Sequence, residues 1–229
     1  MNKVAWAVFS IVVWNGLYLA AQSLLPNKSS EYYSCLRSLC HALFCIIFGL
    51  QQCIADAPLF SIPCKSNCDS QNGILLVSFG YFITNLLWCL YYQPHKRIML
   101  IHHMYSCIVL TRTLFSGTYG RLTTCLIGVL EFSNPFLQAR WLIRAHEQQH
   151  SELFKIVEIM FVLIFFLLRI LIGTMVLIYV FSTSDISIEY KFHGLFIYTV
   201  SVAFMWEIYK YIISRHIQHT NVNMTYLLL

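Results

Sequence analysis

The chain has 229 residues, of which 58% are hydrophobic and 11% charged, and its formal net charge is +5. A soluble domain of this size does not need so much apolar surface, so a large part of it must face lipid. The length allows about seven spanning helices of roughly 20 residues and leaves no room for a separate soluble domain. The positive charge does not indicate a nucleic-acid partner, because Lys and Arg lie between apolar runs.

Apolar windows follow one another along the whole chain, each bounded by Pro, Gly, Asn or charge. The first window lacks the basic run and the cleavage site of a signal peptide, so we expect it to remain as an anchor. The fifth is the least regular, because it contains Glu131, Asn134, Pro135 and Arg140. Transmembrane helices are predicted at about residues 4–25, 35–55, 74–92, 98–118, 121–143, 156–181 and 193–213.

These windows predict an all-α membrane protein with about seven transmembrane helices. The loops at residues 93–97 and 116–120 are short, so sequential helices should be antiparallel neighbours. Residues 1–29 are predicted to form an N-terminal transmembrane anchor, and residues 216–229 a cytosolic tail. We find no internal repeat or low-complexity tract.

The basic residues give an independent test of the seven crossings. Arg112 and Arg169 fall inside predicted helices, and alternation of the loops assigns most of the others to one side. That side should be cytosolic, which places the N-terminus in the lumen or outside and the C-terminus in the cytosol. The sequons at Asn27 and Asn223 are then cytosolic and should carry no glycan. The basic side has Lys28, Arg37, Lys96, Arg97, Arg140, Arg144, Lys155, Lys210 and Arg215, and the other side has Lys3, Lys65, Arg121 and Lys191.

The nine cysteines lie mostly inside apolar windows, where they behave as small hydrophobic residues. Cys53, Cys64 and Cys68 are the ones in or beside a polar loop. Cys64 and Cys68 would pair if that loop is lumenal, or bind a metal if it is not. No histidine or second cysteine pair accompanies them, so we predict no metal site and no cofactor.

Ionisable residues within the windows need a partner, a water-filled cavity or a function, because each costs on the order of 2.5–3.5 kcal/mol at mid-membrane. Depth estimates from the helical rise give Glu131 two candidate cationic partners, Arg112 and Arg169. This group is either a structural ion pair or the lining of a substrate cavity. In the last window, Glu207 and Lys210 are spaced for an intrahelical pair, although Lys210 would equally reach the interface alone.

His102 and His103 are adjacent in the fourth window, near its predicted cytosolic start, and His41 should lie at a similar depth. Adjacent helical residues point about 100° apart, so the pair cannot both turn to one small site. One of them as a general base and the other as a positioning or packing residue fits this geometry. An interfacial polar patch without chemistry is the alternative.

Two runs in the sequence resemble motifs of a known family. They combine a double histidine with a downstream Glu-x-Ser-Asn-Pro-x-Leu-x-x-Arg pattern, a combination that resembles the TLC domain shared by the TRAM, Lag1 and CLN8 proteins, in particular its small members. The likeness covers about residues 30–215, which we therefore interpret as a TLC domain. The runs are His102-His103-Met104-Tyr105-Ser106-Cys107 and Leu130-Glu131-Phe132-Ser133-Asn134-Pro135-Phe136-Leu137-Gln138-Ala139-Arg140-Trp141.

The resemblance implies six helices ringed around a lipid-chain cavity, here preceded by the extra helix of residues 1–29. It also implies residence in the endoplasmic reticulum or connected endomembranes, with the plasma membrane as the other location considered. Ceramide synthases, the enzymes of this family, join a long-chain base to an acyl-CoA with the double histidine and a later His-Asp-x-Ser-Asp run.

The later run departs from the ceramide-synthase pattern. Its histidine is replaced by Leu130, its first aspartate by Glu131 and its second by Asn134. A leucine cannot transfer a proton and an asparagine cannot act as a carboxylate base, so the departure puts ceramide synthesis in doubt. We therefore expect a lipid-binding TLC protein that influences membrane lipid composition or homeostasis.

The alternative is a ceramide-synthase-like N-acyltransferase that uses acyl-CoA, and a seven-helix transporter or receptor is less favoured because the loops are short and no inverted repeat is visible. Candidate catalytic residues are His102, His103 and Glu131. Candidate contacts to lipid or its head group are Arg112, Asn134, Arg140 and Arg169. The expected partner is a membrane lipid, with a sphingoid base or acyl-CoA among the options, and a homo-oligomer is left open.

Overall fold

The computed structural model describes residues 2–54 and 66–227, with side chains through residue 215. The described residues are almost entirely helical, apart from one isolated bridge between Ser66 and Thr118. The elements are α1 (Lys3–Leu24), α2 (Ser30–Phe44), the π-helix η1 (Cys45–Gly49), α3 (Leu50–Ile54), α4 (Asp69–Tyr92), α5 (Arg97–Ser116), α6 (Gly120–Glu131), α7 (Asn134–Ala145), α8 (Glu152–Phe165), the π-helix η2 (Phe166–Ile172), α9 (Gly173–Ser182) and α10 (Ile188–Leu227).

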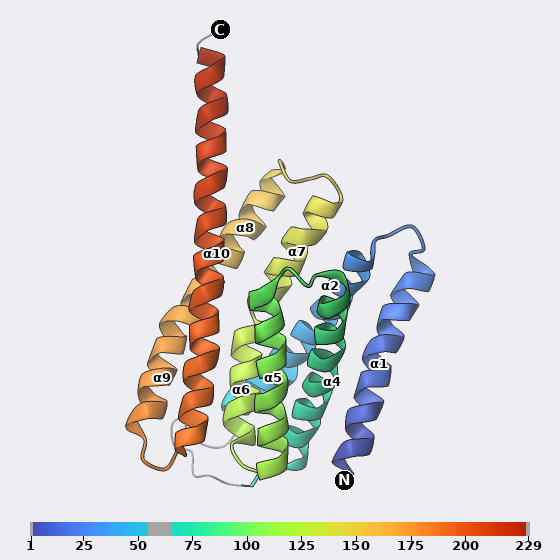
Figure 1. The fold of residues 1–229 in the computed structure, drawn as a ribbon, viewed down its shortest axis with the longest axis vertical. Helices are drawn as coiled ribbons and strands as arrows, with labels where there is room; N and C mark the ends of the chain where they lie inside the picture. The colour runs from blue at the N-terminus through green and yellow to red at the C-terminus, as the bar shows by residue number, and fades with distance from the viewer. Residues whose placement is uncertain (1, 55–65, 228–229) are drawn as a thin grey trace.

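The chain runs up and down a single bundle, and its termini lie at opposite ends (Figure 1). The passes are α1, α2–η1–α3, α4, α5, α6–α7, α8–η2–α9 and α10. Within the described residues, six helical stretches are long and apolar enough to span a membrane. The prediction of an all-α membrane protein with antiparallel neighbouring helices is confirmed.

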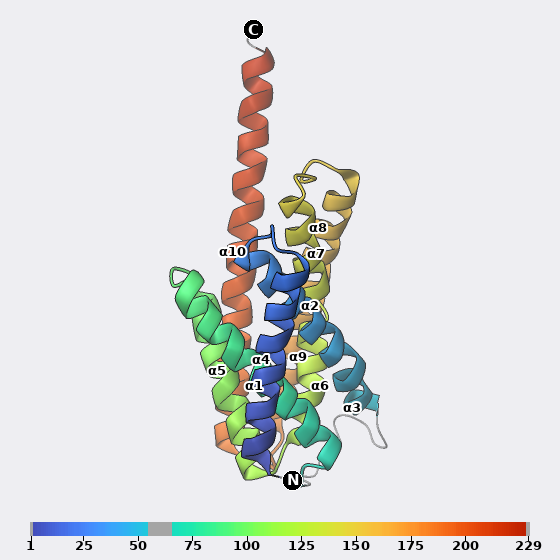
Figure 2. The same ribbon diagram turned by 90° about the vertical axis from the view of Figure 1, so that its right-hand side faces the viewer.

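The two ends of the bundle differ in charge. The loops after α1, α4 and α7 lie at one end and carry or adjoin Lys28, Lys96 and Arg144. We call this the basic end, and the end that holds the N-terminus the opposite end. Helix α10 continues beyond the rest of the bundle at the basic end (Figure 2). It is one continuous helix across residue 215, where the sequence predicted the start of a tail.

The single helix predicted at residues 121–143 is wrong, because this pass is broken between α6 and α7 at Phe132 and Ser133. Pro135 explains the break, since it has no N–H to donate to the carbonyl of Glu131 one helical turn before it. Beside the break, the carbonyl of Leu130 accepts a hydrogen bond from Arg169 Nη2 at 2.9 Å. The break therefore holds Glu131 at the end of a helix, deep in the bundle.

Helix α6 lies unusually close to η1. A Cβ atom added at Gly128 would come within 2.7 Å of the Leu50 nitrogen, and one at Gly49 within 2.8 Å of the Thr124 carbonyl oxygen. Such close backbone approach at small residues is a common way for membrane helices to associate. Next to this contact a disulfide joins Cys53 to Cys125, with their Cα atoms 5.0 Å apart.

The disulfide was not predicted from the sequence, which assigned Cys125 to an apolar window as a small hydrophobic residue. Cys53 and Cys125 are 72 residues apart, and their pairing follows from the contact between η1, α3 and α6. The alternatives considered for Cys64 and Cys68 are not decided, because Cys64 lies outside the described residues.

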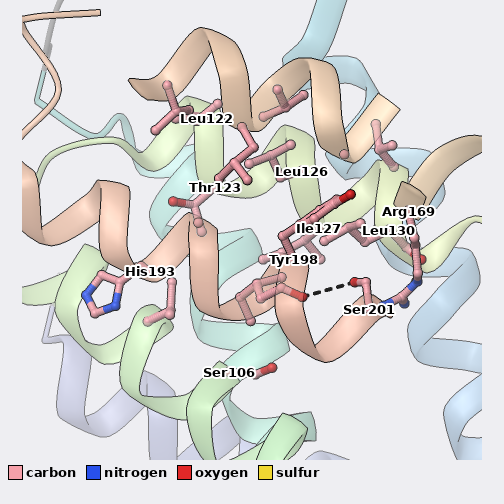
Figure 3. Close-up of a pocket in the computed structure, with 18 of the residues that line it drawn as sticks. Ser106, Leu122, Thr123, Leu126, Ile127, Leu130, Arg169, His193, Tyr198 and Ser201 are labelled. Atoms are coloured by element: carbon pink, nitrogen blue, oxygen red, sulfur yellow. Dashed lines mark hydrogen bonds between the residues drawn. The ribbon is translucent and has the colours of Figure 1, made fainter. Parts of the chain in front are cut away.

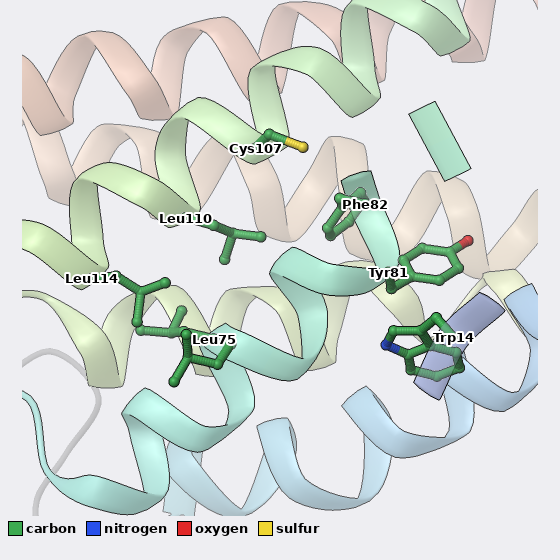
Figure 4. Packing of buried hydrophobic residues seen from close by; sticks show 8 residues of the cluster. Trp14, Leu75, Tyr81, Phe82, Cys107, Leu110 and Leu114 are labelled. Carbon is green, nitrogen blue, oxygen red and sulfur yellow. The ribbon is translucent and has the colours of Figure 1, made fainter. Parts of the chain in front are cut away.

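The main hydrophobic cluster fills the space between α1, α4 and α5. Figure 4 shows Leu75, Leu110 and Leu114 packed together, with the rings of Trp14, Tyr81 and Phe82 farther along the same cluster. Helix α1 is fastened to α4 by hydrogen bonds from Trp14 Nε1 and Ser10 Oγ to the Val77 carbonyl, at 2.9 and 3.1 Å. The predicted anchor is thus packed against the bundle and is not a detached helix.

Candidate functional site

A cavity of about 160 Å³ lies between α5, α6, η2, α9 and α10. Its walls are mostly aliphatic, with side chains such as Leu122, Leu126 and Ile127 of α6 (Figure 3). Polar side chains gather toward its two ends. Arg169 and Ser201 lie at one end, and His193 and Thr123 lie toward the other (Figure 3). Glu131 and His102 also line the cavity and interact electrostatically with Arg169, and the Tyr190 ring lies 5.6 Å from that of His193.

Glu131 is 4% exposed and contacts two side chains from different helices. Its Oε2 accepts a hydrogen bond of 2.5 Å from Asn134 Nδ2 across the helix break. The same oxygen lies 3.7 Å from Nδ1 of His41, which comes from α2. Asn134 and His41 therefore fix the Glu131 carboxylate, and the same side chain lines the cavity.

His41 is fully buried and tightly fixed. Its ring stacks on Tyr81 at a centroid distance of 3.7 Å and an interplanar angle of 6°. Its Nε2 lies 3.2 Å from the Cys45 sulfur. The sequence placed His41 at the depth of the histidine pair but assigned it no partner, because the contact between α2 and α6 is not visible in the sequence.

Arg112 is not a partner of Glu131, and that prediction is wrong. Arg112 makes two hydrogen bonds to Glu189 at the start of α10, at 2.5 and 2.8 Å, and both side chains are nearly half exposed. The reason is that Arg112 lies near the end of α5, beside the first turn of α10. Glu189 is also 3.7 Å from Nε2 of His193, which lines the cavity.

Arg169, the other predicted partner, lies at the same end of the cavity as Glu131. Its side chain is 5% exposed and Nη2 donates to the Leu130 carbonyl. Its Nε is buried and has no hydrogen-bond partner among the described residues. No direct ion pair joins Arg169 to Glu131, but the π-helical turn η2 directs the guanidinium to the cavity. Short π-helical turns within α-helices are frequent at functional sites.

His103 belongs to the packed side of α5, away from the cavity. Arg37 Nη2 donates to Asn85 at 2.9 Å, and since an arginine can only donate, the facing atom must be Oδ1. The Asn85 amide nitrogen therefore faces His103 Nε2, at 3.0 Å. Because the amide nitrogen of Asn85 donates, Nε2 of His103 must accept the hydrogen bond. The proton of the neutral His103 ring is therefore on Nδ1.

His102 lines the cavity, and its Nδ1 is buried without a hydrogen-bond partner among the described residues. The two histidine rings lie 5.3 Å apart and are tilted by 49°, as their 100° separation on a helix predicts. Of the three candidate catalytic residues, the structure brings His102 and Glu131 to one cavity and places His103 elsewhere.

Arg140 does not line the cavity. It lies in α7 near the basic end, where Nε donates to Glu158 Oε1 at 2.9 Å and the guanidinium lies over the Tyr211 ring at 4.5 Å. Glu207 and Lys210 form the intrahelical pair that their spacing permits, at 2.7 Å. Within the described part of the chain, no three His, Cys, Asp or Glu side chains converge as a metal ion would require.

The course of the chain through the bundle and its apolar surface define a membrane protein that crosses the bilayer several times. The sequence profile of the TLC domain matches residues 32–222. The chain therefore belongs to the TLC domain family. It is also similar to TLC domain-containing protein 4 of Homo sapiens, with 27% identity over 151 residues, which is 65% of this chain. The aligned part spans 57% of the length of that relative.

Proposed function

We propose that the protein binds a membrane lipid in the cavity between α5, α6, η2, α9 and α10, and so influences membrane lipid composition or homeostasis. The cavity itself carries this proposal. Its aliphatic walls suit a hydrocarbon chain, and its polar residues offer a guanidinium donor (Arg169), an imidazole (His102) and a carboxylate (Glu131) to a polar group. An apolar cavity of this kind inside a bilayer has lipid as its most abundant ligand.

The polar end supports a ligand with hydrogen-bonding groups. Arg169 Nε and His102 Nδ1 are both buried and unpartnered within the described residues. A buried polar atom without a partner costs about 1–3 kcal/mol, which a bound head group would recover. Asn134 supports the site indirectly, because it holds the Glu131 carboxylate.

The test is to fill the cavity and measure bound lipid. Leu126→Trp places an indole among the aliphatic lining residues. Leu163→Trp, on a lipid-facing residue of α8 that is 51% exposed, is the matched control. We expect mass spectrometry of the purified wild type to show a lipid enriched over an unrelated membrane protein. Leu126→Trp should lose most of it and Leu163→Trp should retain it.

If the wild type carries no enriched lipid, or if both tryptophan variants retain it equally, the cavity is not a lipid site. A melting curve for each variant shows whether Leu126→Trp is folded. If that variant unfolds, the smaller change Leu126→Phe serves in its place.

We further propose that the basic end is cytosolic, with the N-terminus lumenal, in the endoplasmic reticulum or connected endomembranes. Residues 1–29 then act as an anchor, residues 30–215 as the TLC domain, and the remaining residues as a cytosolic tail. Two observations support this orientation. Basic residues gather at one end, and the Cys53–Cys125 disulfide lies toward the other, as expected where an oxidising lumen favours disulfides.

Protease treatment of sealed microsomes tests the orientation. A C-terminal tag should be removed without detergent, whereas an N-terminal tag should be protected. Glycan attached at Asn27, which lies in the loop between α1 and α2 at the basic end, would contradict the proposed orientation.

A second candidate function is acyl transfer of the ceramide-synthase type, and it is favoured by the position of His102 in the cavity, where its Nδ1 has no hydrogen-bond partner in the part of the chain that the structure describes. His102 would take the proton from an amine whose nitrogen attacks the acyl-CoA thioester. The new bond is an amide, the C–S bond breaks, and the proton leaves with the CoA thiol. In an acyl-transfer assay, His102→Ala should abolish product. Equal product from wild type, His102→Ala and His103→Ala would exclude this mechanism.

A further inference from the structure

Three arginines from two helices converge at the basic end, outside the cavity. Arg140 and Arg144 come from α7 and Arg215 from α10. Their guanidinium carbons lie 6.0, 5.8 and 5.3 Å from the ring centre of Phe154 in α8. Phe154 is completely buried, so its ring is held in place, and the three cations lie around it.

The charges of this arginine cluster are not balanced. Arg140 and Arg215 share one carboxylate, that of Glu158, and each uses a different oxygen of it. Arg144 contacts no carboxylate among the described residues and donates instead to the Tyr211 hydroxyl at 2.9 Å. Three guanidinium groups with a single contacting carboxylate leave an excess of two positive charges.

Neighbouring charged residues on the same helices do not correct this excess. Lys155 pairs with Glu152 on α8 at 2.7 Å, and Lys210 pairs with Glu207 on α10 at the same distance. Each of these pairs is neutral by itself. These two pairs therefore leave the excess charge of the arginine cluster unchanged.

The cluster is accessible and partly prearranged. Arg144 is exposed, the side chain of Arg215 is 41% exposed, and that of Arg140 is 16% exposed. The ring of Tyr211 lies 4.5 Å from the Arg140 guanidinium and 5.7 Å from that of Arg144. Guanidinium groups held in this way lose less freedom when they bind, and their planar fork matches the oxygens of a phosphate.

We propose that the arginine cluster binds the phosphate of an anionic phospholipid in the leaflet at the basic end. The position of the cluster indicates that the phosphate belongs to a lipid, because the cluster lies between helices α7, α8 and α10 near the end of the bundle. Basic pockets between transmembrane helices at this level are typical sites for phosphorylated lipid head groups. None of the cluster residues lines the cavity, so this site stands independently of the proposed cavity ligand.

The test is native mass spectrometry of the full chain in detergent, titrated with phosphatidylinositol 4-phosphate and, separately, with phosphatidylcholine. Arg144→Gln removes the arginine that lacks a carboxylate. Arg97→Gln, an exposed arginine at the start of α5, removes the same charge from the same end and is the matched control. We expect the phosphoinositide to bind more tightly than phosphatidylcholine, Arg144→Gln to weaken it about fivefold, and Arg97→Gln to leave it unchanged.

Equal weakening by Arg144→Gln and Arg97→Gln would show general charge attraction and overturn the site. Equal binding of both lipids to the wild type would do the same. Inorganic phosphate and coenzyme A are added in separate titrations as soluble competitors of the lipid. If either competes as effectively as the lipid at equal concentration, the lipid is not the source of the phosphate, and that proposal fails. Melting curves of both variants confirm that the comparison is made on folded protein.

Discussion

The two faces of α5 illustrate two ways in which a membrane bundle treats polar residues. On the face toward α1, α2 and α4, which we call the packed half, His103 accepts a hydrogen bond from Asn85 and lies beside aromatic rings. On the face toward α9 and α10, which we call the cavity half, His102 faces an open volume.

This difference teaches that the same residue type, at adjacent positions, has opposite expected roles. In the packed half a polar side chain is part of the architecture, and its loss should destabilise the fold. In the cavity half a polar side chain is available to a ligand, and its loss should change binding more than stability. The following substitutions test that distinction.

The largest effect is expected from Gly128→Val at the contact between α6 and η1. The added side chain would meet backbone atoms of Gly49 and Leu50 at 2.8 and 2.7 Å, and backbone cannot move aside as a flexible side chain does. Overpacking typically costs about 1–3 kcal/mol, and we expect this change to lie at or above the upper limit. The yield of monodisperse protein in detergent should fall sharply, and so should the fraction that forms the Cys53–Cys125 disulfide on a non-reducing gel.

Gly16→Val is the control for this substitution. Gly16 lies in α1, and a Cβ atom added there would have no neighbouring atom within 4 Å, so valine should be accepted. Equal losses for Gly16→Val and Gly128→Val would show that the close approach of α6 and η1 is not needed for folding.

An intermediate effect is expected from His103→Leu, compared with His102→Leu. Removing His103 leaves an Asn85 N–H without its acceptor, which should cost about 1–3 kcal/mol. Nδ1 is unpartnered in both rings among the described residues, but His102→Leu breaks no hydrogen bond of the kind that Asn85 makes to His103, so its cost should be below about 1 kcal/mol. Thermal melting in one detergent measures both. The distinction between the two halves fails if His102→Leu is the more destabilising of the two.

The smallest effect is expected from Arg112→Gln at the outer edge of the cavity half. Arg112 and Glu189 are 45% and 42% exposed, and water screens such exposed ion pairs, so they contribute little to stability. A double-mutant cycle with Glu189→Gln, followed by thermal melting, should give no coupling above the error of the measurement. A coupling clearly above that error would mean that this pair acts as a structural clamp between α5 and α10.

Much of the architecture could be predicted because hydrocarbon thickness sets the length of an apolar run, and six helical stretches do meet this requirement. The break at Phe132 and Ser133 was harder to place. The sequence showed Pro135 in the fifth window, but whether a proline bends a helix or interrupts it depends on the neighbours that pack against that point. Here one such neighbour is Arg169, which donates to the carbonyl of Leu130, 39 residues away along the chain.

The candidate site was predicted in part. Adjacency of His102 and His103 was enough to show that the two rings diverge, because helical geometry is local. The partner of Glu131 was not predictable, since depth estimates give height in the membrane but no direction around the bundle. Arg112 and Arg169 were therefore equally acceptable, whereas the structure pairs Arg112 with Glu189 and brings His41 to Glu131.

The sequence by itself determined the class of protein, the approximate crossings and the charge difference between the ends, because these depend on properties that each segment has alone. Only the tertiary structure decided which polar groups meet, which histidine faces the cavity and how three arginines come to lie around one phenylalanine ring. These depend on how helices rotate and pack against one another, and hydropathy carries no information about that rotation.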